Sequence, residues 1–243
     1  MVCTTRGGGV SSGPFASLNL AGHVADDSDR VLENRKRLAT RLGRPLEALR
    51  FLEQVHGVAT VFSGEEAPSS PPVADAQVTD RPGLLLAVLT ADCAPVLLAD
   101  PRSGVIGAAH AGWRGALDGV LESCLHSMTT MGARPYDIRA LIGPCIRQSA
   151  FQVGGDVHAR FLATDTAFGQ FFAPETDSDR YRFDLPGLLR LRLLRAGLAE
   201  DCLYDVGHCT YTENHLFFSH RHATRNGLPT CGRQLSAIGR LPG

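Results

Sequence analysis

Three short apolar runs in the middle of the chain most constrain its fold. The first, Leu84–Thr90, is almost continuous Leu, Ala and Val, and turn residues bound it. Val96–Ala99 and Val105–Ala109 follow, separated by a turn at Asp100–Gly104. A short apolar run between turn residues is typical of a strand that is buried on both faces. The sequence therefore predicts a buried strand with a β-hairpin beside it.

Segments with helical periodicity flank these strands. The longest, Gly115–Met131, repeats its apolar residues every three or four positions and ends before Gly132, a pattern typical of an amphipathic helix. A second helix is expected at Asp29–Leu42, capped by Asp29 and with Leu32 on its buried face. Further predicted helices are Val153–Leu162 and Leu185–Ala196, and further predicted strands are Leu49–Val55, Val58–Phe62, Arg139–Ile142, Tyr204–Val206 and Leu216–Ser219.

Together these elements predict an α/β fold, a mixed sheet covered by helices. The chain has 243 residues, of which 44% are hydrophobic, so it is long enough to bury a substantial core. The Pro- and Ser-rich stretch Ser63–Pro72 is interpreted as a surface loop that is too short to separate two domains. We therefore expect one domain over residues 1–243.

Composition excludes several classes of partner. The net charge is −1, so the chain has no basic surplus for nucleic acid or an anionic membrane. No apolar run approaches the ~18 residues that span a bilayer, and the N-terminus lacks the apolar core of a signal peptide. The seven cysteines include no CxxC pair and are expected to be mostly buried thiols in a reducing compartment. A cytoplasmic protein, monomeric or weakly oligomeric, is the resulting prediction.

Two histidines and one cysteine lie at the ends of predicted strands. His56 follows one strand, Cys93 follows the first apolar run, and His110 ends the third run, just before a helix. Strand ends near helix N-termini are where α/β sheets bind ligands. One thiolate and two imidazoles suit a catalytic zinc site with an open position for water. They equally suit a Cys93 nucleophile with His110 or His56 as base, or a buried thiol beside two hydrogen-bonded histidines, and the spacing along the chain does not decide.

Better-known metal motifs do not fit the sequence. A nucleobase deaminase of the zinc class needs a second Cys after Pro144-Cys145, and none follows at the required spacing. HExxH and the phosphate-binding P-loop are absent. His220-Arg-His222 is the only H-x-H pair, and we interpret it as a solvated loop.

A series of motifs resembles one known family over roughly residues 1–238. In order, the motifs match the blocks of the multicopper-polyphenol-oxidase (laccase) domain family, also called the YfiH/YlmD or peptidoglycan-editing-factor family. They are Gln54-Val-His-Gly57, Ala74-Asp-Ala-Gln-Val-Thr-Asp80, Thr90-Ala-Asp-Cys-Ala-Pro-Val96, His110-Ala-Gly-Trp-Arg-Gly115, Ile142-Gly-Pro-Cys-Ile146, Phe183-Asp-Leu185, Cys209-Thr-Tyr211 and Phe217-Phe-Ser219.

The resemblance implies a function. It implies a zinc-dependent purine nucleoside phosphorylase that acts on adenosine, inosine and methylthioadenosine and has adenosine deaminase activity. It also implies that His56, Cys93 and His110 ligate the metal, usually zinc, with copper as another possibility. The implied fold is similar to the cysteine hydrolase fold of a cytotoxic necrotizing factor. Two alternatives therefore stay open: a cysteine hydrolase or amidase that edits peptidoglycan precursors, and a copper-dependent polyphenol oxidase.

A nucleoside and phosphate as substrates require further residues. Phosphate favours a bidentate Arg or a helix N-terminus, and the candidates are Arg114, Arg221 and Arg233. Asp92 is a candidate to orient a ligand histidine or to handle a proton. Trp113 could stack on a purine or pack in the core. The C-terminal segment departs from the family pattern at His222, where an Arg is usual, and at Cys231, which puts the substrate preference in doubt.

Overall fold

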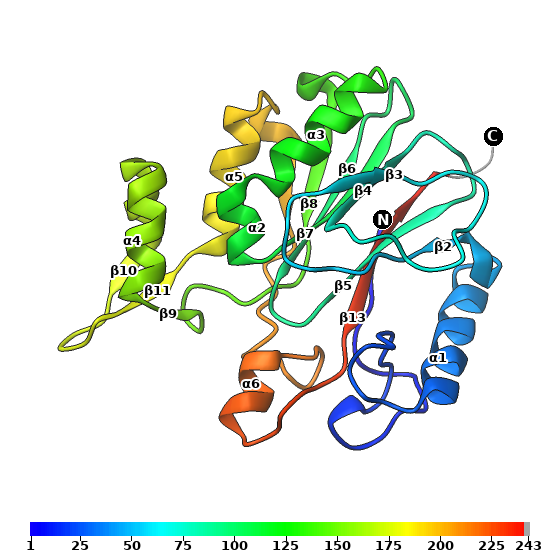
Figure 1. Ribbon diagram of the computed structural model, residues 1–243, viewed down its shortest axis with the longest axis horizontal. Helices are drawn as coiled ribbons and strands as arrows, with labels where there is room; N and C mark the ends of the chain where they lie inside the picture. Colours follow the sequence, from blue (N-terminus) through cyan, green and yellow to red (C-terminus); the bar gives the residue numbers. More distant parts are fainter. Residues whose placement is uncertain (241–243) are drawn as a thin grey trace.

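Two β-sheets stacked face to face form the centre of the computed structural model, which describes residues 1–240 (Figure 1). The larger sheet has the strand order β12-β8-β6-β7-β4-β3 and the smaller sheet has the order β1-β13-β5-β2. Both contain parallel and antiparallel pairs. The larger sheet consists of β3 (Thr60–Phe62), β4 (Ala76–Thr79), β6 (Ala94–Ala99), β7 (Ile106–Ala111), β8 (Arg139–Ile142) and β12 (Leu203–Asp205), and the smaller sheet of β1 (Val2–Cys3), β2 (Leu49–Arg50), β5 (Leu85–Thr90) and β13 (Gln234–Gly239).

Strand β5 shows why its sequence is apolar throughout. Leu86 and Val88 pack between the two sheets, whereas Ala87 and Leu89 pack against the N-terminal segment and helix α1 (Ser28–Arg41) on the other face, as the alternation of side chains along a strand requires. The predicted burial on both faces is confirmed, and so is the hairpin of β6 and β7. However, β5 stacks on this hairpin from a second sheet instead of pairing with it.

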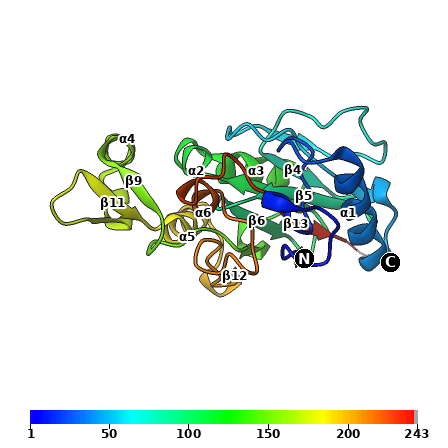
Figure 2. The same cartoon turned by 90° about the horizontal axis from the view of Figure 1, so that it is seen from below.

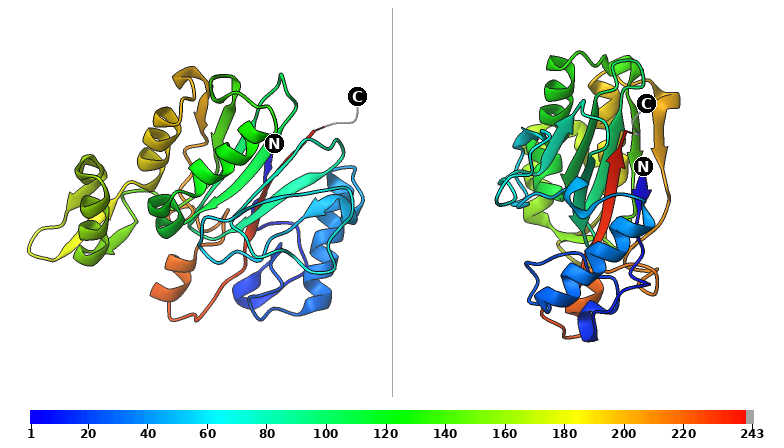
Figure 3. Two further views of the ribbon diagram at one scale, coloured as in Figure 1. Left: turned by 45° about the horizontal axis from the view of Figure 1, so that its top comes forward. Right: turned by 90° about the vertical axis from the view of Figure 1, so that its right-hand side faces the viewer.

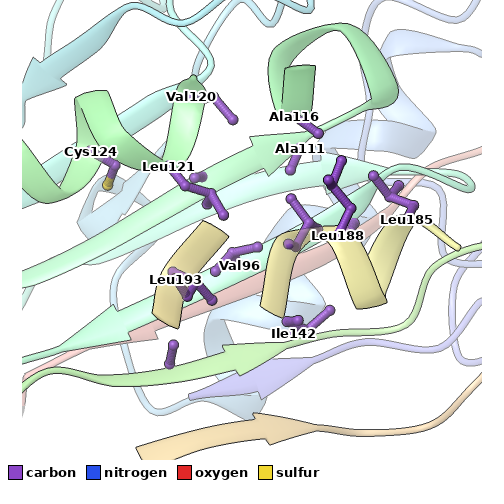
Figure 4. Close-up of a cluster of buried hydrophobic side chains, with 14 of the residues drawn as sticks. Val96, Ala111, Ala116, Val120, Leu121, Cys124, Ile142, Leu185, Leu188 and Leu193 are labelled. Atoms are coloured by element: carbon purple, nitrogen blue, oxygen red, sulfur yellow. The ribbon is translucent and has the colours of Figure 1, made fainter. Parts of the chain in front are cut away.

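Helices α2 (Trp113–Asp118), α3 (Val120–Thr130) and α5 (Leu185–Arg195) cover the outer face of the larger sheet (Figures 1 and 3). Figure 4 shows this layer, in which Val96 and Ile142 of the sheet meet leucines of α3 and α5. The molecule is therefore layered as helices, larger sheet, smaller sheet, and α1 with the N-terminal segment. The expected single mixed sheet is in fact two mixed sheets, with a third small sheet at one side.

The predicted helix over residues 115–131 is two helices. Gly119 ends α2 and precedes α3 with a φ of +106°, a backbone conformation that an α-helix cannot contain. The periodic apolar pattern survives this break, because residues of both helices face the same core cluster. The pattern alone therefore concealed the break.

Helix α1 begins at Ser28, one residue earlier than predicted. Its N-cap is Asp27, whose carboxylate accepts the backbone N–H of Asp29 at 2.8 Å and of Arg30 at 3.3 Å. Asp29, the predicted cap, lies in the first turn. Leu32 is 42% exposed, and the buried face carries Asn34 instead. Its amide binds the N-terminal segment, because Nδ2 donates to the carbonyl of Asn19 at 2.8 Å.

A three-stranded sheet and one helix form an arm that protrudes from the layered body (Figures 1 and 2). The sheet has the order β10-β11-β9, and the rings of Phe172 and Phe183 stack in its core at 4.5 Å. The sequence predicted only the helix. The arm consists of β9 (Gln152–Gly154), α4 (Gly155–Thr164), β10 (Phe172–Pro174) and β11 (Arg180–Phe183).

The C-terminal part differs from the sequence-based prediction. Leu216–Ser219 was expected to be a strand but forms turns that lead into α6 (His220–Arg225), so that the pair His220 and His222 is helical rather than loop. The β13 strand was not predicted. Short 3-10 helices complete the chain at Gly13–Phe15, Leu46–Ala48, Pro135–Asp137, Thr166–Phe171 and Glu200–Cys202. Within residues 1–240, no helix is both long and apolar enough to cross a membrane.

Candidate functional site

The structure brings His56, Cys93 and His110 together. Each offers one ligand atom, and the three atoms all lie within 4.8 Å of one another. The Sγ atom of Cys93 is 3.7 Å from Nε2 of His56, and the two imidazole rings are 4.9 Å apart between centroids. His110 is buried and His56 is exposed, so the group opens to solvent on one side. This group could hold a metal ion.

The position of each residue follows from how the chain passes between the two sheets. His56 lies in the connection from β2 to β3, and Cys93 lies in the connection from β5 to β6. Both connections leave the smaller sheet and enter the larger one. His110 is the penultimate residue of β7 in the larger sheet. The His-Cys-His group therefore lies where the two sheets meet, and not at the end of a single sheet.

One buried carboxylate, that of Asp75, contacts both histidine segments. Its Oδ1 accepts Nδ1 of His110 at 2.8 Å and the backbone N–H of His56 at 3.0 Å. Its Oδ2 accepts the backbone N–H groups of Val55 and Gly57 at 3.1 and 2.7 Å. Burial alone would raise the pKa of Asp75, but the hydrogen bonds from His110 and the backbone lower it. With Nδ1 engaged, Nε2 of His110 remains as the atom available to a ligand.

Asp75 fills the orienting position for which Asp92 was a candidate. Asp92 makes no hydrogen bond to a histidine within residues 1–240; its oxygens accept the hydroxyl of Thr210 at 2.7 Å and the backbone N–H of Arg221 at 2.6 Å. It lies in the partly buried break between β5 and β6, just before Cys93, and adopts a φ of +89°. The sequence contained a sign of the role of Asp75, a single carboxylate inside the apolar strand region Ala74–Thr79, which burial tolerates only when it is hydrogen-bonded.

Gln54 and Gly112 fix the remaining geometry. The Gln54 amide exchanges two 2.8 Å hydrogen bonds with the backbone of Leu89, which ties the His56 connection to β5. A Cβ atom on Gly112 would lie 2.9 Å from Cδ2 of His56 and 3.0 Å from Sγ of Cys93. The position therefore needs glycine because of close approach, since its φ of −76° is ordinary.

The thiol and the imidazole of the group alter each other's pKa. Burial alone would raise the pKa of Cys93, but His110 and His56 beside it lower that pKa to about 6. Burial alone would lower the pKa of His110, but Cys93 and Asp75 raise it to about 9. Cys124, which has no such neighbours, has its pKa raised to about 12 by burial. Cys93 therefore favours the thiolate form, which metals and electrophiles both require.

A pocket of about 360 Å³ opens over this group. The predicted residues Asp92, Arg114, Arg221 and Arg233 all line it, together with the His-Cys-His group. Trp113 lines it too, and it packs against the main core. His23 and His220 also line the pocket, from an N-terminal loop and from α6; the sequence did not predict His23 as a site residue, and His220 had been interpreted as part of a solvated loop.

The pocket has more positive than negative groups. Within residues 1–240, Arg114, Arg221 and Arg233 form no ion pair, and Asp92 is the only carboxylate among the described lining residues. Arg233 instead donates to the carbonyl oxygen of Cys231 at 2.6 Å. Hydrogen bonds to neutral oxygens position a guanidinium without neutralising its charge, so the pocket is electropositive.

The two departures from the family pattern lie beside the pocket. His222 is on α6 but does not line the cavity; its ring lies 5.8 Å from that of Tyr211. Cys231 is buried, and its contribution is the carbonyl oxygen that holds Arg233. The altered residues therefore influence the pocket only through their neighbours.

Comparison with known proteins places this geometry in a family. Residues 1–241 match the family described as multi-copper polyphenol oxidoreductase laccase. The chain is 43% identical to a purine nucleoside phosphorylase of Deinococcus radiodurans over 92% of this chain and 84% of that protein. It is 41% identical to purine nucleoside phosphorylase YfiH of Escherichia coli strain K12, over 92% and 88%.

A solved structure agrees with these matches. The crystal structure of YfiH from Bacillus licheniformis superposes with a TM-score of 0.91 and 33% identity, covering 98% of this chain and 91% of that one. The resemblance drawn from the sequence motifs is confirmed over nearly the whole chain. The chain therefore belongs to the multi-copper polyphenol oxidoreductase laccase family, alongside the YfiH proteins.

Proposed function

We propose that this protein is a metal-dependent purine nucleoside phosphorylase. The observation that carries the proposal is the pocket itself, which is lined by the His-Cys-His group and by three arginines that form no ion pair within residues 1–240. A phosphorylase has to hold an anionic phosphate beside a nucleoside, and unpaired guanidinium groups supply that affinity. The names of the relatives from Deinococcus radiodurans and Escherichia coli support the same activity.

The donor set fits zinc as the resident metal, held by His56, Cys93 and His110. Two imidazoles and a thiolate leave a fourth position open, as catalytic zinc sites do, and a carboxylate that orients a ligand histidine is common around zinc. Asp75 supplies that carboxylate. When bound, zinc would supply a Lewis acid that polarises a substrate oxygen or water. Copper also accepts these donors, so elemental analysis is part of the test.

In phosphorolysis, an oxygen of phosphate forms a bond to C1′ of the ribose while the bond from C1′ to the base breaks. The electron pair of that bond goes to the base, which takes up a proton and leaves, and ribose 1-phosphate is the other product. Arg114, Arg221 and Arg233 would hold the phosphate near C1′. Asp92 is proposed to accept a hydrogen bond or proton in the pocket, since each of its oxygens has a further acceptor position.

The proposed substrates are adenosine, inosine and methylthioadenosine. Trp113 would stack on the purine, because its ring lines the pocket. Adenosine deamination at the same centre is the second proposed activity, in which water replaces the amino group at C6 and ammonia leaves. Both activities would then take place in the same pocket.

The test combines metal analysis with product analysis. Purified protein is expected to contain zinc and to release hypoxanthine from inosine only when phosphate is present. Adenosine should yield adenine with phosphate and ammonia without it. If metal-replete protein releases neither base nor ammonia from these nucleosides, the proposal is wrong.

One observation favours a second candidate function, a cysteine hydrolase or amidase that edits peptidoglycan precursors. The pKa of Cys93 is lowered to about 6 beside two histidines, as a thiolate nucleophile requires. Under this alternative, which a fold shared with cytotoxic necrotizing factor would favour, a chelator would leave hydrolysis of a Ser-containing muropeptide precursor intact, while Cys93→Ser would abolish it. A copper-dependent polyphenol oxidase would instead contain copper and consume oxygen with a phenol.

A further inference from the structure

A second hollow, of about 480 Å³, lies next to the pocket of the His-Cys-His group. Trp113, Phe151 and Arg221 line both cavities, so the two are contiguous. The other walls come from β9 and from Val157 of α4, which belong to the protruding arm, and from Arg225 of α6. The hollow therefore lies where the arm joins the body. Figure 1 shows this junction between β9 and the helices of the body.

This hollow has a strongly positive lining. Arg180, Arg221 and Arg225 line it, no carboxylate does, and none of the three forms an ion pair within the described residues. Two of them are held by neutral oxygens: Arg221 donates to the carbonyl of Gln152 at 2.9 Å, and Arg225 donates to the hydroxyl of Tyr211 at 3.1 Å. These hydrogen bonds orient the guanidinium groups of Arg221 and Arg225, while their positive charge remains available to an anion.

The chemistry of the lining selects the ligand. Planar guanidinium groups around a concave surface bind phosphate through paired N–H donors. Arg180 and Arg225 are exposed, so a free anion would be held weakly there. A phosphate joined covalently to a group in the neighbouring pocket would bind more tightly, because the first contact raises the effective concentration of the second.

We infer that the hollow binds phosphate groups carried by a nucleoside in the adjoining pocket, so that nucleoside 5′-phosphates are ligands of this protein. In such a molecule the phosphates extend from C5′, away from the C1′ atom that would react. The inference rests on the proposed function, because it places the nucleoside in the pocket of the His-Cys-His group. It adds a second anion site, formed by Arg180 and Arg225 together with Arg221, which also lines the pocket proposed for the phosphate of the reaction.

Calorimetric titration of the full-length, metal-replete protein tests this inference with adenosine, ADP and inorganic pyrophosphate. ADP is expected to bind roughly 10-fold or more tightly than adenosine, since charge-assisted hydrogen bonds add to the nucleoside contacts. The difference in affinity between ADP and adenosine should shrink as the salt concentration is raised. Pyrophosphate alone should bind more weakly than ADP. Equal affinities for ADP and adenosine, or for ADP and pyrophosphate, would overturn the inference.

A double variant separates the hollow from the rest of the site. Arg180→Gln with Arg225→Gln should remove most of the excess affinity for ADP and leave adenosine binding unchanged, because neither residue lines the nucleoside pocket. Arg139→Gln, at an exposed arginine of β8 that lines neither cavity, is the matched control and should bind ADP like the wild type. An excess that persists in the double variant would contradict the inference. If the wild type binds ADP tightly but turns over no nucleoside, the proposed reaction is wrong, whereas the inferred binding of phosphate groups in the hollow still holds.

Discussion

His110 and His56 are held by the same oxygen atom, Oδ1 of Asp75, through the Nδ1 atom of one and the backbone N–H of the other. A shift of this carboxylate would therefore move two proposed ligands at once. The third, Cys93, is not hydrogen-bonded to Asp75 but follows the end of β5, which Gln54 ties to the His56 connection. The arrangement suggests that the geometry of the group is set before any metal binds.

Asp75→Asn is expected to weaken zinc binding about 10- to 100-fold, the usual range for loss of such an orienting group. Asp75 accepts hydrogen bonds from the His110 ring and from the backbone N–H groups of residues 55–57. An amide has only one acceptor oxygen, and its NH₂ group would face at least one of these donors. Competition with a chromogenic chelator measures the affinity. Asp118→Asn, at an exposed carboxylate of α2, is the control and should bind zinc normally. Equal affinity in both variants would contradict a positioning role for Asp75.

Removal of the metal should abolish phosphorolysis and leave the fold intact. The core clusters consist of apolar residues in the two sheets and their helices and include none of the three proposed ligands. We expect unchanged far-ultraviolet circular dichroism, a lower melting temperature because bound ligand stabilises the native state, and recovery of activity when zinc is added. Full phosphorolysis by protein that elemental analysis shows to be metal-free would refute this.

Gly112→Ala should impair the site without a change in backbone conformation. The added methyl group would lie 2.9 Å from His56 and 3.0 Å from Cys93, so at least one of them must move. A loss of roughly 10-fold or more in zinc affinity or kcat/KM is expected, as small misplacements at such centres are costly. At Gly22 a Cβ would meet open space, so Gly22→Ala serves as the control. If the two variants behave alike, close packing at Gly112 is not important.

Arg114→Gln should raise the KM for phosphate and leave the KM for inosine nearly unchanged. Arg114 is exposed, and its guanidinium lies over the ring of Trp113 at 4.9 Å from the centroid, so the substitution should not disturb folding. Loss of one charge-assisted hydrogen bond corresponds to about 10- to 100-fold in affinity. Arg139→Gln again controls for removal of a positive charge. A larger effect on inosine than on phosphate would place Arg114 at the nucleoside instead.

Stability should depend on pH through Asp100, at the turn of the hairpin of β6 and β7. Burial alone would raise its pKa, but N–H groups of Arg102 and Arg134 and the hydroxyl of Ser103 lower it. A carboxyl with a lowered folded-state pKa stabilises above its unfolded pKa of about 3.9, and this contribution is lost as the pH falls through the folded value.

Asp100→Asn should therefore lower the free energy of unfolding by about 1–3 kcal/mol at neutral pH, and the gap to the wild type should narrow below about pH 4. Urea denaturation at several pH values measures it, with Asp118→Asn as the control. A gap that stays constant down to pH 3 would show that the charge of Asp100 does not matter.

The sequence predicted the strands that carry the site better than the layers around them. The apolar runs of β5, β6 and β7 and the break at Cys93 were readable, because burial and turns leave local patterns. A strand buried on both faces has the same pattern whether a helix or another sheet covers it, so the second sheet could not be predicted. The break at Gly119 was also hidden, because the periodicity continues across it.

Other parts of the site had no local pattern to reveal them. His23 and His220 approach the pocket from opposite ends of the chain, and only the tertiary fold brings them together. The strands of the arm are short and rich in exposed charged residues such as Arg180, so they lack the alternation of a half-buried strand. Asp75 was visible as an isolated carboxylate, but which residues it contacts depends on the pairing of β4 with β7.

Because the His56 and Cys93 segments each cross from the smaller sheet to the larger one, the proposed site needs both sheets. A fragment that retained one sheet would keep stubs of both crossings but not their mutual alignment. Any sliding of one sheet over the other would pull the sulfur and the imidazoles apart while leaving each sheet internally sound. Activity should therefore be lost at a lower denaturant concentration than secondary structure. Enzymatic turnover would then report how well the two sheets are packed against each other.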